Sequence, residues 1–223
     1  MDLSLFNEGG VMFLLRWIHL LAGITWIGLL YYFNFVQGEY FKEADGDAKS
    51  DVIQKLVPKT LWWFRWGAMF TFLSGAALFA MKHLSGMGIM IRAVLGTLMF
   101  LNVWLIIWPN QKIVIASAKQ VAGGGEALGE VGAALGKAGL ASRTNTLFSI
   151  PMLFFMASSV HLGGLQTSVH SVGVVSLALS FGLIAALQLN GMFGKTGPIT
   201  TVKGVIHSGI FLTIILYLLA EMT

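Results

Sequence analysis

The sequence contains no cysteine. This absence excludes disulfides, thiolate metal ligands, thiol catalysis and a covalently attached c-type haem, because the haem attachment motif needs cysteines. Any metal or metal-containing cofactor must then be held by histidine, methionine or carboxylate side chains.

Charged residues are also scarce. They make up 11% of the chain, whereas a soluble domain has about 25%, and 56% of the residues are hydrophobic. This balance is typical of a membrane protein. The net charge of +4 is modest, and no basic, aromatic patch of the nucleic-acid-binding type occurs, so we expect no nucleic acid partner. The first apolar run continues from residue 11 to about residue 36, which is too long for a cleavable signal peptide.

The apolar runs predict an all-α, polytopic bundle of about six transmembrane helices. A membrane-spanning helix needs roughly 20 mostly apolar residues. Pro151 interrupts the fourth run, which is tolerated where neighbouring groups satisfy the freed carbonyl. We expect a single transmembrane domain over residues 1–223, in contact with the lipid bilayer. The expected spans are residues 11–36, 61–82, 87–108, 144–165, 171–192 and 200–220.

Basic residues indicate the orientation of these spans. The connections on one side are rich in lysine, whereas the other side has only Arg16, Lys82 and Arg92, at or inside helix ends. By the positive-inside rule the lysine-rich connections face the cytoplasm, and both termini face outward. The basic residues of these connections are Lys42, Lys49, Lys55, Lys59, Lys112, Lys119, Lys137, Arg143 and Lys195, with Lys203 just beyond.

The two long cytoplasmic connections are expected to be mostly irregular. Residues 37–60 carry mixed charges and suggest a solvated loop, and residues 123–141 suggest a short surface helix. Pro109 is expected to end the third helix, with Asn110 bonding freed carbonyls. Asn145 and Thr146 are expected to cap the fourth helix.

Histidines within or beside the spans are the main functional candidates, because ionisable groups inside a membrane are costly and mark function by default. At about 1.5 Å per helical residue, His19 lies about 12 Å below the outer end of its helix and His161 about 6 Å. His83 and His170 fall at outer helix ends. His207 lies roughly 10 Å from the inner end of the last helix. Four of the five histidines therefore gather toward the outer leaflet.

This distribution predicts a b-type haem clamped by two imidazoles on facing helices. The expected pair of iron ligands is His19 and His161, with His83 as the rival partner of His19. His207 is a candidate for a second haem or for proton handling. The expected haem number is therefore one or two.

Two arginines are candidates for pairing with the haem propionates, since a guanidinium matches a carboxylate. Arg16 precedes His19 by three residues, so it lies on nearly the same helix face and closer to the outer surface. Arg92, at the outer start of the third span, is the second candidate. A simpler interpretation is also open, in which Arg16 reaches the outer headgroups and His19 is hydrogen-bonded within a cofactor-free bundle.

Three function classes follow from these residues. The first is a haem-b electron-transfer protein or redox subunit. The second is a non-redox structural or assembly subunit of a larger membrane complex. The third is a transporter using His207, Arg92 and the broken fourth helix, but no acidic residue lies in any span before Glu221. Separately, the stretch LWWFRW at residues 61–66 is typical of an aromatic belt with a basic anchor.

Three segments resemble the membrane domain of the bacterial membrane-bound urate oxidases, or urate hydroxylases. They are RWIHLLAGITWIG (16–28), LGTLMFLNVWLIIWPNQK (95–112) and RTNTLFSIPMLFFMASSVH (143–161). The WPNQK and NTLFSIPMLF parts are the most specific, and the last two helices add little. The first segment also resembles helices of the copper-resistance D family and of the membrane protoporphyrinogen oxidase.

The resemblance implies a multi-pass protein of the bacterial inner membrane that handles electrons, with haem as its cofactor. Members of this family carry a cytochrome c domain after the membrane part and have about eight membrane helices. Because this sequence has no cysteine, we expect a separate cytochrome c or another redox subunit as its electron partner, in an oligomer or complex.

Overall fold

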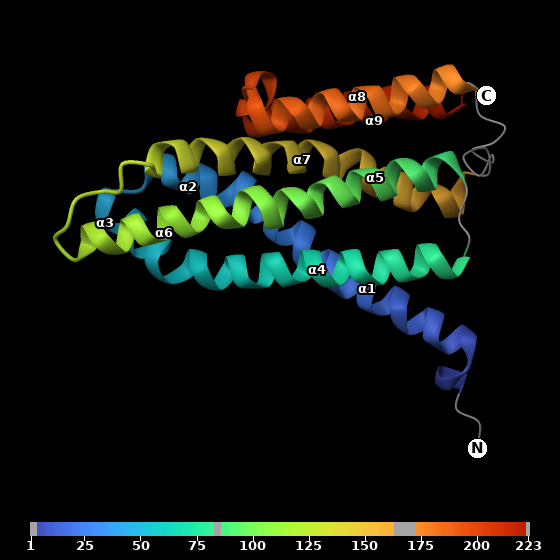
Figure 1. Cartoon of the computed structure of the whole chain (residues 1–223), viewed down its shortest axis with the longest axis horizontal. Coiled ribbons are helices and arrows are strands. Elements are labelled where there is room, and N and C mark those ends of the chain that lie inside the picture. Colours follow the sequence, from blue (N-terminus) through green and yellow to red (C-terminus); the bar gives the residue numbers. More distant parts are fainter. Residues whose placement is uncertain (1–3, 83–85, 163–172, 222–223) are drawn as a thin grey trace.

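The computed structural model describes residues 4–82, 86–162 and 173–221, which form helices joined by short turns (Figure 1). No strand occurs in these three stretches. In three places a π-helical segment joins two α-helices into one long continuous or nearly continuous rod. In chain order the elements are η1 (Ser4–Phe6), α1 (Glu8–Tyr31), η2 (Tyr32–Gln37), α2 (Gly38–Glu43), α3 (Gly46–Asp51), η3 (Val52–Leu56), α4 (Val57–Lys82), α5 (Met87–Leu101), η4 (Asn102–Ile107), α6 (Trp108–Ala122), α7 (Val131–His161), α8 (Val174–Phe193), η7 (Gly197–Thr200) and α9 (Val202–Glu221).

The rods lie side by side, and both termini are at the same end of the bundle (Figure 1). The turns between α2 and α3, between α6 and α7, and between α8 and α9 lie at the opposite end. Helix α1 packs on α4, and α5 packs on α7, which also contacts α6, α8 and α9. The N-terminal part of α1 diverges from the other helices (Figure 1).

Large apolar side chains fill the bundle, and others cover its outside. Trp26, Phe64, Phe148 and Phe155 are almost completely buried. Within the described ranges, five helices are long and apolar enough to cross a membrane, in the rods Glu8–Glu43, Gly46–Met81, Met87–Ala122, Val174–Phe193 and Val202–Glu221. The chain is therefore an all-α bundle of the multi-pass membrane type.

Helix α7 is not among these five candidates, although it is as long as a membrane span. Its central part is rich in polar residues, and Thr144, Asn145, Thr146 and Ser149 are all buried. These side chains lie against other helices, so they do not need to be compatible with lipid. The helix continues through Pro151 to His161 without a break.

The predicted connections are far more helical than expected. The rods extend through most of the expected loop 37–60, and a turn at residues 123–130 replaces the start of the expected surface helix. The predicted end of the third helix at Pro109 is wrong: α6 begins at Trp108 and continues to Ala122. Proline is tolerated there because it occupies the first turn after the π-helical segment η4. Asn110 does bond a backbone carbonyl, as predicted, donating to that of Ile106 at 2.7 Å.

The predicted capping role of Asn145 and Thr146 is also wrong. Helix α7 begins at Val131, fourteen residues before Asn145, so both residues lie well inside the helix. Their side chains instead make hydrogen bonds within the bundle, Thr146 to the Ser142 carbonyl and Asn145 to a neighbouring helix.

Candidate functional site

His19 lies on α1 and faces α4, the helix on which α1 packs. It is half-buried. Its ring nitrogen Nδ1 lies 2.9 Å from the backbone carbonyl oxygen of Thr71 and 3.2 Å from Oγ of Ser74. Two residues of α4 therefore fix the orientation of the imidazole.

These contacts determine which ring nitrogen carries the proton. A carbonyl oxygen can only accept, so Nδ1 must donate its N–H to Thr71. The Ser74 hydroxyl donates to the Phe70 carbonyl at 2.6 Å, so it too is available to His19 as an acceptor. In a neutral imidazole this leaves Nε2 with a free lone pair, and no described residue hydrogen-bonds it. Metal-bound histidines have this same arrangement, in which the second nitrogen donates to a carbonyl or carboxylate.

Glycine at position 75 makes room for the ring. A Cβ atom at Gly75 would lie 2.9 Å from Cε1 of His19 and 3.3 Å from Nδ1, closer than side chains tolerate. About two helical turns earlier on α4, a Cβ at Gly67 would lie 3.2 Å from the Trp26 backbone nitrogen. Small residues on α4 thus allow the two helices to approach closely, as is common in membrane bundles.

Arg92, the second arginine candidate, contacts α7. It lies half-buried near the start of α5, and its Nη1 atom is 3.4 Å from the Met156 carbonyl of α7. Arg92 therefore links the start of α5 to the C-terminal part of α7.

Three of the other predicted residues lie at the surface. Arg16, His161 and His207 are exposed on the protein surface, His161 as the last residue of α7. Among the described residues, the His19 ring hydrogen-bonds Thr71 and Ser74 and no second histidine. His83 and His170 lie outside the described residues. Within the described ranges no group of three or more histidine and acidic side chains could hold a free metal ion.

The sequence analysis missed a buried amide network that joins three helices. Asn102 donates to Oδ1 of Asn145 at 2.8 Å and to Oε1 of Gln188 at 3.0 Å, and Gln188 donates back to Asn102 at 2.7 Å. Asn145 also donates to the Met99 carbonyl at 3.0 Å. Asn102 and Asn145 come from the two segments that carried the most specific family resemblance. These segments therefore meet through side-chain amides in the core.

The LWWFRW segment has two faces rather than one belt. Trp62 and Trp63 are exposed, as expected of an aromatic belt. Arg65 instead stacks on aromatic rings of the third rod, with its guanidinium carbon 4.1 Å from the Trp108 ring centre and 5.1 Å from that of Trp104. The basic anchor is thus held by cation–π contacts between rods.

Comparison with known proteins gives one family. A family model described as urate oxidase N-terminal matches residues 83–218, which is more than half of the chain. No curated protein and no solved structure matches. The matched range includes the amide network and Arg92. It also extends through α8 into α9, so the expectation that the last two helices add little to the family resemblance was wrong. His19 lies before it.

Proposed function

Because the chain belongs to the urate oxidase N-terminal family, we propose that it is an integral membrane haem-b protein that transfers electrons, with His19 as an axial ligand of the iron. The observation that carries this proposal is the hydrogen bond from Nδ1 of His19 to the Thr71 carbonyl. That bond orients the ring and leaves the lone pair of Nε2 free to coordinate a metal. A neutral imidazole with a free lone pair suits iron in a bis-imidazole site.

The remaining predicted residues have roles consistent with this proposal. We assign the propionate carboxylates to Arg92, which is half-buried on α5, and to Arg16, which precedes His19 by three residues on α1. The second imidazole comes from His161 or His83. His161 is five residues beyond Met156, the residue that Arg92 contacts, about 7.5 Å along the helix axis. His207 lies on α9, which packs mainly on α7 and α8 and not on α1, and this favours a role outside the His19 site.

When bound, haem supplies one-electron chemistry, and the protein supplies ligands, burial and charge. In this chain His19 would hold the iron, and Gly75 leaves room for the imidazole. Arg92 would supply a positive charge that favours the reduced state of the haem. The cysteine-free sequence cannot attach a c-type haem, so we propose a separate cytochrome c or other redox subunit as the electron partner.

The proposed topology has six spans, which are the five candidates named above and α7. Both termini lie outside the bacterial inner membrane. This topology is supported by the two termini lying at one end of the bundle and the lysine-rich connections at the other (Figure 1). On this topology His19 and Arg92 lie toward the outer leaflet, where a periplasmic electron carrier has access.

Haem content of histidine variants tests the ligand assignment. We expect purified His19→Ala to lose most of the haem found in the wild-type protein, measured by the pyridine haemochrome assay. His207→Ala is the matched control, because its helix α9 packs mainly on α7 and α8 and not on α1, and it should retain haem. Loss of haem in His161→Ala or in His83→Ala identifies the second iron ligand. Wild-type haem content in folded His19→Ala would contradict the proposal, and a haem-free wild type would favour the non-redox subunit.

A further inference from the structure

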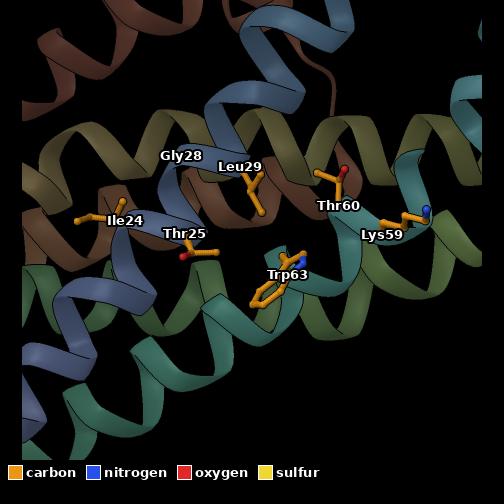
Figure 2. Close-up of a pocket in the computed structure, with 7 residues that line it drawn as sticks. All are labelled: Ile24, Thr25, Gly28, Leu29, Lys59, Thr60 and Trp63. Carbon is orange, nitrogen blue, oxygen red and sulfur yellow. The ribbon is translucent and has the colours of Figure 1, made fainter. Parts of the chain in front are cut away.

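An open groove runs along the outside of the bundle between α1 and α4, toward the end that holds the lysine-rich turns. Its volume is about 450 Å³, which is within the range of small-molecule sites, roughly 300–1,000 Å³. In Figure 2 the residues that line the groove extend from Ile24 at one end to Lys59 at the other. The lining residues are Ile24, Thr25, Gly28 and Leu29 of α1 and Lys59, Thr60 and Trp63 of α4.

The walls of this groove are effectively apolar. The hydroxyl of Thr25 donates to the Leu21 carbonyl at 3.1 Å, and that of Thr60 donates to the Leu56 carbonyl at 3.0 Å. Both hydroxyls therefore have partners in their own helix. A Cβ at Gly28 would meet no atom within 4 Å, so the absence of a side chain there leaves the hollow open. The groove suits a flexible hydrocarbon chain better than a polar ligand.

One end of the groove carries an unpaired positive charge. Lys42 and Lys55 form ion pairs with acidic residues on their own helices, but Lys59 has none among the residues that the structure describes. A second hollow, lined by Pro58, Lys59, Trp62 and Trp63, adjoins this end. Both tryptophans are about half exposed, Trp62 at 48% and Trp63 at 60%. Exposed indoles beside a lysine are typical of the level of lipid headgroups.

From this arrangement we propose that the groove binds one anionic phospholipid. An acyl chain lies along the groove past Gly28, the phosphate pairs with Lys59, and the headgroup region covers Trp62 and Trp63. The charge of Lys59 selects an anionic lipid over a zwitterionic one, and the apolar groove selects a membrane lipid over free phosphate. This site is independent of the haem proposal, and its position places the lipid in the leaflet on the lysine-rich side.

Native mass spectrometry of the full-length protein tests this site. The protein is transferred from mixed phosphatidylglycerol and phosphatidylcholine vesicles into detergent, and retained lipids are counted. We expect one phosphatidylglycerol to be retained in preference to phosphatidylcholine. Lys59→Gln should weaken its retention about five-fold, the effect of one lysine near a membrane surface. Lys203→Gln is the matched control, since Lys203 is also exposed at this end of the bundle, and should leave retention unchanged.

A second variant tests the groove itself. Gly28→Leu places a side chain in the hollow and should reduce retention of phosphatidylglycerol at least as strongly as Lys59→Gln. Quenching by brominated phosphatidylglycerol provides a measurement on the folded wild type: the quenched fraction should fall in Trp63→Phe. Equal retention of the two lipids, or equal effects of Lys59→Gln and Lys203→Gln, would overturn the proposal. So would a dimer that Gly28→Leu converts to monomer, because the occupant would then be a second copy of the chain.

Discussion

At the scale of single residues, the environment of His19 is built by its neighbours on α4. Thr71 accepts from Nδ1, Ser74 accepts beside it, and Gly75 leaves the space that the ring occupies. None of these three residues is charged, so the imidazole can stay neutral within a membrane. A neutral ring with a free Nε2 atom is the form that binds iron.

Gly75→Ala should disturb this site. The added methyl group would lie 2.9 Å from Cε1 of His19, so the ring or the helices must move apart. We expect lower haem content and a melting temperature below that of the wild type, despite the higher helix propensity of alanine. Gly136→Ala on α7 is the control, because its methyl group meets no atom within 4 Å, and it should leave both quantities unchanged or raise the melting temperature. Equal behaviour of the two variants would show that the space at Gly75 is unimportant.

Arg92→Gln should lower the midpoint potential of the haem. A positive charge near the iron stabilises the reduced state, so its removal favours the oxidised state. An interaction of about 1 kcal/mol corresponds to roughly 40 mV for one electron. Potentiometric titration measures this shift, and Arg16→Gln should shift the potential less because Arg16 is exposed. An unchanged or raised potential in Arg92→Gln would contradict the role of Arg92.

At the scale of helices, polar side chains set the contacts of α7 with its neighbours. Asn145 joins α7 to Asn102 and to the Met99 carbonyl, and Tyr31 of α1 lies 3.0 Å from the hydroxyl of Ser149. Such bonds specify how helices pair, because apolar faces alone leave their relative rotation poorly determined.

Asn145→Ala should destabilise the bundle by about 1–3 kcal/mol, since it removes the buried hydrogen bonds of Asn145 with the Asn102 amide and with the Met99 carbonyl. The free energy of unfolding, measured by denaturant titration in detergent, checks this value. Asn190→Ala is the control, because Asn190 is exposed and bonds only the Lys195 backbone of a turn. A destabilisation in Asn145→Ala no larger than in Asn190→Ala would mean that the network is unimportant for stability.

The limits of the sequence analysis are physical and are clearest at this scale. Apolar runs and the cost of polar groups in lipid predicted the membrane helices and singled out His19. They could not predict that the helices continue beyond the apolar runs, because the extensions pack on one another outside the apolar zone. Thr71 is 52 residues from His19, and Asn145 is 43 from Asn102. Such contacts depend on the rotation of each helix, which a single sequence does not determine.

At the scale of the whole molecule, the bundle has two different ends. Both termini and the last turn of α7 lie at one end, and the turn at residues 123–130 lies at the other (Figure 1). The lysine-rich connections lie with that turn, so the proposed orientation separates the His19 site from the cytoplasmic side.

The absence of cysteine makes this orientation easy to test. A cysteine introduced at Glu126 or at Phe6 is the only thiol in the chain. In intact spheroplasts a membrane-impermeant maleimide should label Phe6→Cys and leave Glu126→Cys unlabelled until the membrane is broken. Both positions are exposed on the protein, so a difference in labelling reports the side of the membrane on which each position lies. The reverse pattern would invert the topology, and labelling of both would contradict it.

The central claim, that this bundle holds a b-type haem, is tested most directly by a visible spectrum. The wild-type protein is produced with haem supplementation, purified folded in detergent, and measured before and after reduction with dithionite. The account predicts a b-type α-band in the reduced-minus-oxidised spectrum, with about one haem per chain for a single bis-imidazole site. A featureless spectrum from folded protein would contradict it.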